Sequence, residues 1–276
     1  MQRNITAILK NYVKTLITQV QYLPYDVADV LSGKRDPLTP PRRLIFVGGG
    51  DYRQIGNEFF KYFVDYCGLK PDHRVLDVGC GIARMAVPLT SYLKQGSYEG
   101  FDIVRDGIKW SSRTISTRYP NFRFQLADIY NKVYNPGGRY DASEYRFPYE
   151  DGSFDLVFLT SVATHLMPKD LEHYFAEVSR VLKPHGRTLI TFFLLNEEAR
   201  LPMSQHRSLL DFSIQGDGYR TISASSAEQA VAFEEQYIKQ LYGSHGLTIV
   251  DPIRYGSWSG REKSLSFQDI VIAQKA

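Results

Sequence analysis

The sequence predicts an α/β protein with a doubly wound, mostly parallel sheet of seven strands. From about residue 52 to residue 195, short apolar runs alternate with segments of helical periodicity, which is typical of βαβ units. The run Arg187–Leu195 is almost continuously apolar, as expected for a strand in a sheet covered on both faces. Because 43% of the 276 residues are hydrophobic, the chain can bury a sizeable core.

The elements of this region can be placed in order. Five strands are expected at residues 73–79, Ser97–Ile103, Asn121–Ala127, Ser153–Thr160 and Arg187–Leu195. The helices are expected at about Tyr52–Tyr66, Ala83–Leu93, Arg105–Tyr119 and Asp170–Lys183. Apolar residues at i, i+3, i+4 and i+7 make the last helix the clearest, and we expect Pro184 and Gly186 to end it.

The last third of the chain has a different pattern. Residues Asn196–Gln229 show no clear period, and Ala230–Tyr242 has helical spacing that ends at Gly243. The segments Leu247–Arg254 and Phe267–Ala273 complete the seven strands as an antiparallel pair.

Residues 1–45 are expected to form an N-terminal helical cap and linker, ahead of a main domain at 46–276. Apolar residues recur at helical spacing over Ile5–Val20, and a second short helix is expected at Asp26–Leu31. The following proline-rich stretch, residues 33–43, has the composition of a linker. A basic amphipathic helix can also lie on a membrane surface, but we favour a cap packed on the main domain.

Composition excludes several classes of protein. The chain has 33 basic and 30 acidic residues, so its net charge of +3 gives little support to a nucleic-acid partner, and we expect none. Two cysteines, Cys67 and Cys80, are too few for a disulfide framework or a four-cysteine zinc site, and we expect no metal. No apolar stretch reaches the length of a signal peptide or a membrane span, so we expect a cytoplasmic protein. The oligomeric state stays open.

The most informative motif is the glycine-rich turn after the first predicted strand, Asp77-Val78-Gly79-Cys80-Gly81-Ile82-Ala83-Arg84. Ligands of open α/β sheets bind at the carboxyl ends of strands, where such turns lie. In the dinucleotide pattern G-x-G-x-x-G/A the third small residue would be Arg84, which is too large. The pattern D-x-G-x-G-x-G fits better, with Ala83 in its last place. At this motif the sequence resembles the class I S-adenosylmethionine-dependent methyltransferases, in particular those that act on small molecules.

Three further segments carry the same resemblance in order: Gly100–Ile103, Ala127–Ile129 and Phe154–Thr160. The resemblance implies a Rossmann-like methyltransferase fold and S-adenosylmethionine as cofactor. It implies that the cofactor-binding residues are Asp77, Gly79, Cys80, Gly81, Arg84, Asp102, Ile103, Asp128, Ile129 and Thr160.

The resemblance also implies individual roles at the cofactor site. Asp77 would order the turn through the cofactor ammonium, Asp102 would bind the ribose, and Asp128 with the Ile129 backbone would bind the adenine, one face of which Ile103 would cover. As alternatives, Asp77 or Asp128 could be a helix N-cap or a turn former. Arg84 could bind the cofactor carboxylate or lie at the surface.

Two residues are candidates for catalysis. His165 follows the fourth strand directly, at a position similar to a functional histidine of phosphoethanolamine methyltransferases, and an imidazole suits general-base chemistry. Its alternative role is a hydrogen bond to backbone beneath the site. Tyr52, at the start of a helix, could close the site, pair with His165 or simply pack in the core.

The function expected from these features is methyl transfer from S-adenosylmethionine to an oxygen or nitrogen of a small-molecule acceptor. The irregular segment Asn196–Gln229 would be the lid of the acceptor site. Aromatic residues in predicted loops would line an apolar pocket: Tyr130, Tyr134, Tyr219, Tyr255 and Trp258. The alternatives are an NAD(P)-dependent oxidoreductase and a cofactor-binding protein without transfer activity.

Overall fold

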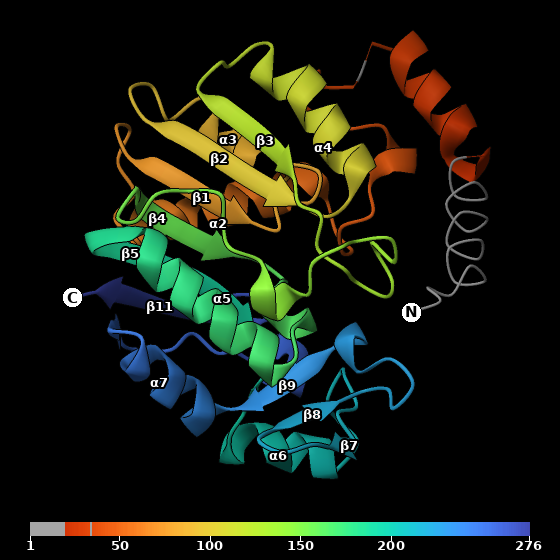
Figure 1. Cartoon of the computed structure of the whole chain (residues 1–276). Helices are drawn as coiled ribbons and strands as arrows, with labels where there is room; N and C mark the ends of the chain where they lie inside the picture. Colours follow the sequence, from red (N-terminus) through yellow and green to blue (C-terminus); the bar gives the residue numbers. More distant parts are fainter. Residues whose placement is uncertain (1–19, 34) are drawn as a thin grey trace. The chain divides into compact units, whose positions relative to one another are not determined.

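The computed structural model describes residues 20–33 and 35–276, which divide into two compact units, Met1–Asp141 and Ala142–Ala276. Seven strands form one sheet in the order β10-β11-β5-β4-β1-β2-β3 (Figure 1). This order, with flanking helices, confirms the predicted α/β class. The predicted helix Ile5–Val20 falls, except for its last residue, outside the described residues. Within the described residues, no helix combines the length and the apolar character that crossing a membrane requires.

The first unit holds a three-stranded parallel part of the sheet. Strand β2 pairs with β1 on one side and with β3 on the other, and α4 packs on β2 and β3 (Figure 1). The elements are η1 (Arg42–Leu44), α2 (Tyr52–Asp65), β1 (Arg74–Val78), α3 (Ala86–Leu89), β2 (Ser97–Asp102), α4 (Arg105–Ser111), the π-helical η2 (Ser112–Ser116) and β3 (Phe122–Leu126).

The helix after the glycine-rich turn is much shorter than predicted: it covers Ala86–Leu89, whereas the prediction was Ala83–Leu93. Ala83 has a φ of 62°, a left-handed conformation that no regular helix contains. Pro88 lies in the first turn of α3, where backbone N–H groups lack a helical partner, so its missing N–H costs nothing.

Asp26 connects the N-terminal helix to the linker. The helix runs over residues 20–31, so it begins earlier than the predicted Asp26. The Asp26 carboxylate is buried and accepts the Arg42 backbone N–H at 2.6 Å and the Arg43 guanidinium at 2.8 Å. This buried acid, together with the Asp29 carboxylate that accepts the Arg42 guanidinium at 3.0 Å, therefore ties the linker to the helix.

The second unit contains the rest of the main sheet. Strands β4 and β5 are parallel, whereas β11 is antiparallel to both β5 and β10, as predicted for the last two strands. Its elements outside the second sheet are η3 (Ala142–Glu144), β4 (Phe154–Leu159), η4 (Ala163–His165), α5 (Pro168–Val181), β5 (Leu182–Phe192), α7 (Glu235–Ser244), β10 (Leu247–Ile249), η6 (Ser257–Ser259) and β11 (Asp269–Lys275).

Pro184 and Gly186 do not end the preceding helix, contrary to the prediction. Helix α5 ends at Val181, and Leu182 already has the extended conformation of β5. Phe154 pairs with Leu182 but Leu156 pairs with Arg187, so the residues between them form an irregularity within the strand. Proline and glycine are typical of such bulges.

The segment predicted to be irregular, Asn196–Gln229, contributes to a second sheet of order β6-β9-β8-β7. The strands of this sheet are β6 (Leu194–Leu195), β7 (Ile214–Gln215), β8 (Tyr219–Thr221) and β9 (Val231–Glu234). The same region also contains the helices α6 (Glu197–Ser204) and η5 (Ala227–Gln229). The predicted helix from Ala230 therefore begins only at Glu235. Residues Val231–Glu234 pair with β6 and β8 instead, so tertiary pairing overrides the local helical spacing.

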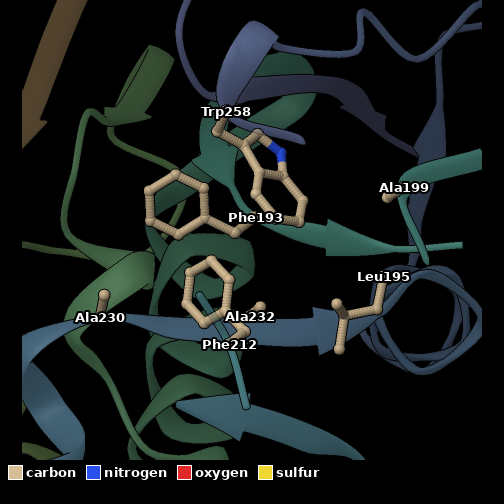
Figure 2. Packing of buried hydrophobic residues seen from close by; sticks show 7 residues of the cluster. All are labelled: Phe193, Leu195, Ala199, Phe212, Ala230, Ala232 and Trp258. Carbon is tan, nitrogen blue, oxygen red and sulfur yellow. The ribbon is translucent and has the colours of Figure 1, made fainter. Parts of the chain in front are cut away.

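A cluster of buried apolar residues joins strands β6 and β9 of this second sheet to α6 and η6 (Figure 2). Its three aromatic rings form a mutual contact, with centroid separations of 5.4 Å for Phe193–Trp258, 5.3 Å for Phe212–Trp258 and 5.2 Å for Phe193–Phe212. Trp258 is fully buried, so it belongs to this core, although the sequence placed it in a loop. The cluster comprises Phe193, Leu195, Ala199, Phe212, Ala230, Ala232 and Trp258.

A buried carboxylate, Asp269, joins the two sheets at the start of β11. It accepts the backbone N–H of Leu194 at 2.7 Å, the backbone N–H of Gly256 at 2.6 Å and the Trp258 indole N–H at 2.7 Å. Burial raises the pKa of Asp269 from 3.8 to about 6, and the three N–H groups oppose that shift. The carboxylate therefore fixes three segments that are distant in sequence.

We predict that Asp269→Ala strongly destabilises the protein, because three buried N–H donors lose their acceptor. The expected loss in the free energy of unfolding is about 3–5 kcal/mol, measured by urea denaturation at pH 7. Asp217, an exposed acid of the same unit, provides the control, and Asp217→Ala should change stability by less than about 0.5 kcal/mol. Equal effects of the two substitutions would contradict the role of Asp269.

Candidate active site

The glycine-rich turn after β1 has a backbone that only small residues tolerate. Gly79 and Gly81 have φ values of 78° and 57°, in the left-handed region that favours glycine. The Gly79 and Cys80 N–H groups both donate to the Phe101 carbonyl oxygen, at 2.9 and 3.0 Å. The turn is thus hydrogen-bonded to the carboxyl end of β2.

Asp102, at the end of β2, holds this turn in place. Its Oδ2 accepts the Gly81 N–H at 2.7 Å, and its Oδ1 accepts the Val104 N–H at 2.8 Å. Burial raises the pKa of Asp102, and these N–H groups counteract the rise. Because a carboxylate oxygen has more than one acceptor position, each oxygen can still accept a hydroxyl group. Asp102 therefore has a structural role that the sequence did not reveal, and its ribose-binding role stays a prediction.

Asp77 is completely buried, and only one of its carboxylate oxygens has a hydrogen-bond partner. Oδ2 accepts the Tyr98 hydroxyl at 2.6 Å, while Oδ1 is buried without a partner among the described residues. Burial, with a smaller contribution from the nearby Asp102, raises the pKa of Asp77 from 3.8 to about 8, although the Tyr98 hydrogen bond opposes the rise. An unpaired buried carboxylate oxygen is costly, and such atoms point to a missing ligand. The ammonium group of an amino acid is a ligand of the right chemistry.

The segment just before α2 lies against the glycine-rich turn. The Arg84 guanidinium donates to the carbonyl oxygens of Val47 and Gly48, at 2.7 and 3.1 Å. A Cβ added at Gly81 would lie 2.6 Å from Val47 Cγ1, so glycine is required there by contact as well as by conformation. Arg84 is only 8% exposed, so the alternative of a surface residue is wrong.

Tyr52 is buried at the start of α2, where its hydroxyl donates to the Ile82 carbonyl oxygen at 2.8 Å. Its ring lies under the Arg84 guanidinium, 5.8 Å from the ring centroid. Burial raises the pKa of Tyr52, so the phenol stays protonated. In this structure Tyr52 therefore supports the glycine-rich turn, which agrees with the packing role among its expected alternatives.

Asp128 and Ile129 follow β3, at the end predicted to bind adenine. The Asp128 carboxylate forms an ion pair with Arg139, with Oδ2 2.5 Å from Nε, and accepts the Arg139 backbone N–H at 3.2 Å. Ile129 forms a β-bridge with Tyr140 and is buried, so the segment between them folds back on the end of β3. The loop aromatics Tyr130 and Tyr134 of this segment are exposed.

His165 lies in the second unit, in the short helix η4 after β4. Its Nδ1 is 2.9 Å from the Glu228 carbonyl oxygen, which can only accept, so Nδ1 carries the proton. The neutral ring then presents Nε2 as a base. Burial lowers the pKa of His165 below 6.5, which keeps the ring neutral at pH 7. Thr160 follows β4 directly and precedes Ser161, whose φ of 58° marks a sharp turn.

Several residues of these sites were not predicted from the sequence. Tyr98 lies on the same face of β2 as Gly100 and Asp102, a relation that the strand period of two could have revealed. Val47 and Arg139 come from loops, and the Glu228 carbonyl comes from the one-turn 3-10 helix η5, so no period indicates which residue meets the site.

Comparisons with known proteins identify the family. A family model described as a methyltransferase domain matches residues 75–186. A phthiotriol/phenolphthiotriol dimycocerosates methyltransferase of Mycobacterium ulcerans is 34% identical over 158 residues, which are 55% of this chain and 51% of that protein. A tRNA N(3)-cytidine methyltransferase of Gallus gallus is 27% identical over 168 residues, which are 57% of this chain and 40% of that protein. The chain thus spans about half, or less, of the length of these relatives.

A solved structure described as a SAM-dependent methyltransferase of Methanosarcina mazei has 25% identity and a TM-score of 0.51, covering 75% of this chain and 94% of that chain. The fold, the glycine-rich turn and these matches agree. Residues 75–186 therefore match the methyltransferase-domain family, and these findings support the class I S-adenosylmethionine-dependent methyltransferases that the motifs predicted. The tRNA relative means that the expected exclusion of a nucleic-acid partner has no support.

We predict that Asp77 makes the stability of the cofactor-free protein depend on pH. The unfolded chain loses this proton near the ordinary pKa of 3.8, whereas the folded chain keeps it up to about pH 8. Stability should therefore fall as the pH rises from about 4 to about 8, by up to about 1.4 kcal/mol per pH unit. Urea denaturation at pH 5, 7 and 9 measures this fall, and Asp77→Asn should remove the part of it above about pH 6, where the raised pKa of Asp269 no longer contributes.

Asp72 provides the matched control, because it is an exposed acid five residues earlier in the same unit. Asp72→Asn should leave the pH profile of stability as it is in the wild type. Parallel pH profiles of the wild type and Asp77→Asn would show that Asp77 is ionised normally in the folded protein.

Proposed function

We propose that this chain binds S-adenosylmethionine in its first unit and transfers the methyl group to an oxygen or nitrogen of a small-molecule acceptor. The observation that carries the proposal is the pair of buried acids around the glycine-rich turn. Asp102 holds the turn through the Gly81 N–H, and Asp77 keeps one buried oxygen that has no partner within residues 20–33 and 35–276. An adenosyl amino acid offers hydroxyl groups to the first acid and an ammonium group to the second.

The residues of the first unit fit the parts of the cofactor. Asp77 would hold its ammonium group, and the glycines of the turn would let its amino acid part approach the backbone closely. Asp102 would accept ribose hydroxyls, and Asp128 with Ile129 would take the adenine. Arg84 already donates to Val47 and Gly48, so we assign it to holding this segment over the turn. The bound cofactor supplies an electrophilic methyl group on a sulfonium.

We assign the role of general base to His165. Its Nδ1–H is fixed on the Glu228 carbonyl oxygen, which leaves Nε2 free to take a proton from the acceptor. Burial lowers the pKa of the ring, so the basic form dominates at neutral pH. Glu228 belongs to the segment Asn196–Gln229, so the proposed lid provides the group that orients the base.

The acceptor class is proposed on two grounds. The net charge of +3 is small for a protein that binds a polynucleotide, and the relative from Mycobacterium ulcerans is named for a dimycocerosate acceptor. The tRNA methyltransferase relative supplies the competing class. A screen for S-adenosylhomocysteine formation therefore needs two arms, one of hydrophobic small molecules with hydroxyl or amino groups and one of bulk tRNA. Turnover with tRNA alone would overturn the proposed acceptor class.

We predict that S-adenosylhomocysteine raises the melting temperature of the protein and that NAD does not. A ligand at 100 times its Kd stabilises the folded state by about 2.7 kcal/mol, which is several degrees in a protein of this size. Asp102→Ala should abolish the shift, since it removes both the ribose acceptor and the support of the turn. A shift with NAD in place of S-adenosylhomocysteine would favour the oxidoreductase alternative.

We predict that His165→Gln lowers kcat by about 10²–10⁴-fold without changing the affinity for S-adenosylhomocysteine. In the wild type, kcat/KM should rise with pH and then stay level, with its inflection below the ordinary imidazole pKa of 6.5, because burial lowers the pKa of His165 and the neutral imidazole is the active form. His173→Gln is the matched control: the His173 Nε2 lies 3.0 Å from the Tyr145 carbonyl oxygen, and the substitution should leave both quantities unchanged.

Unchanged turnover and an unchanged pH profile in His165→Gln would remove this residue as the base. A cofactor-binding protein without transfer activity would instead bind S-adenosylhomocysteine but form none of it with any acceptor.

A further inference from the structure

Tyr98 is a buried phenol next to the cofactor site that the proposed mechanism has not used. It is completely buried in β2, and its ring stacks on Phe122 with centroids 5.2 Å apart. Its hydroxyl donates to Asp77 Oδ2 at 2.6 Å. This is the hydrogen bond that determines which oxygen of Asp77 has a partner.

The sheet register explains why Tyr98 reaches Asp77. Strands β1 and β2 lie side by side (Figure 1). In their register Asp77 pairs with Gly100, and Tyr98 lies two residues before Gly100 on the same strand face. A Cβ added at Gly100 would lie 3.0 Å from Tyr98 Cε1 and 2.9 Å from Cys80 Cβ. The missing side chain at Gly100 therefore leaves the space through which the Tyr98 ring extends to Asp77.

The groups around Asp77 make this hydrogen bond important. Asp102 raises the pKa of Asp77, whereas the Tyr98 hydroxyl lowers it. The Cys80 thiol is also buried nearby, and burial raises its pKa, so it stays uncharged. Among these neighbours the Tyr98 hydroxyl is the group that favours the ionised carboxylate.

We infer that Tyr98 is a positioning residue of the cofactor site: it holds Asp77 Oδ2 and so reserves Oδ1 for the ammonium group of the cofactor. The inference rests on the proposed function, and in it Tyr98 affects only the binding of the amino acid end of the ligand. The adenosine end does not contact Asp77 in this scheme. Binding of an ammonium-bearing ligand then releases the Asp77 proton, because the cation stabilises the carboxylate.

Two ligands test this inference directly. S-adenosylhomocysteine carries the ammonium group, and 5′-methylthioadenosine has the same nucleoside but lacks the amino acid part. Tyr98→Phe should weaken S-adenosylhomocysteine about tenfold near pH 7 and leave 5′-methylthioadenosine unchanged. The pH at which S-adenosylhomocysteine affinity reaches half its maximum should also move upward. Isothermal titration calorimetry at several pH values measures all three quantities.

Matched variants separate this role from simple packing. Tyr92→Phe removes another phenol of the same unit, which donates to the Leu69 carbonyl oxygen, and should change neither affinity. In an Asp77→Asn background, Tyr98→Phe should have no further effect on the pH profile. If Tyr98→Phe does not fold, 3-fluorotyrosine at position 98 retains the ring and is a stronger donor, so the midpoint should move to lower pH.

The outcomes are distinguishable. Equal weakening of both ligands by Tyr98→Phe, or an unchanged pH midpoint with either variant, would overturn the inference and leave the proposed function intact. If the wild type binds neither ligand, the proposed function fails and the inference fails with it. A selective loss for the ammonium-bearing ligand, with the expected shift in pH, supports both.

Discussion

The hydrogen bonds of the Asp102 carboxylate determine the shape of the cofactor site. One oxygen holds the Gly81 N–H and the other holds the Val104 N–H, so the glycine-rich turn and the start of α4 are both fixed to the end of β2. The left-handed conformation of the turn is unfavourable for most residues, and this buried acceptor helps to stabilise it. Arg84, Val47 and Tyr52 all contact this turn, so their placement depends on the conformation that Asp102 stabilises.

The second unit is organised by the same physical device. Asp269 is buried at the start of β11 and accepts three N–H groups, which come from a strand, a loop and the Trp258 side chain. Buried carboxylates are stable only when their oxygens are paired, so each one fixes the segments that donate to it. Trp258 is held in the aromatic cluster of Figure 2 for this reason as well as by its packing.

Asp77 differs from both of these acids, and the difference connects structure with function. One of its oxygens is paired, and the other is buried with no partner in the part of the chain that the structure describes, so the carboxyl holds its proton. A cationic ligand group stabilises the carboxylate instead. The surroundings of His165 likewise favour one protonation state, because the Glu228 carbonyl oxygen holds Nδ1–H and burial favours the neutral ring. Both residues are set by their surroundings for one protonation state.

The sequence by itself determined the fold class, the strands at the glycine-rich turn and the family. Apolar periodicity and the spacing of Asp77, Gly79, Gly81 and Asp102 are local properties, so they can be recognised without coordinates. Only the tertiary structure decided the rest. The helix predicted from Ala230 became β9, because strand pairing outweighs helical spacing, and the proposed lid acquired a sheet of its own. Tyr98, 21 residues from Asp77, became its partner through strand register, which no local pattern encodes.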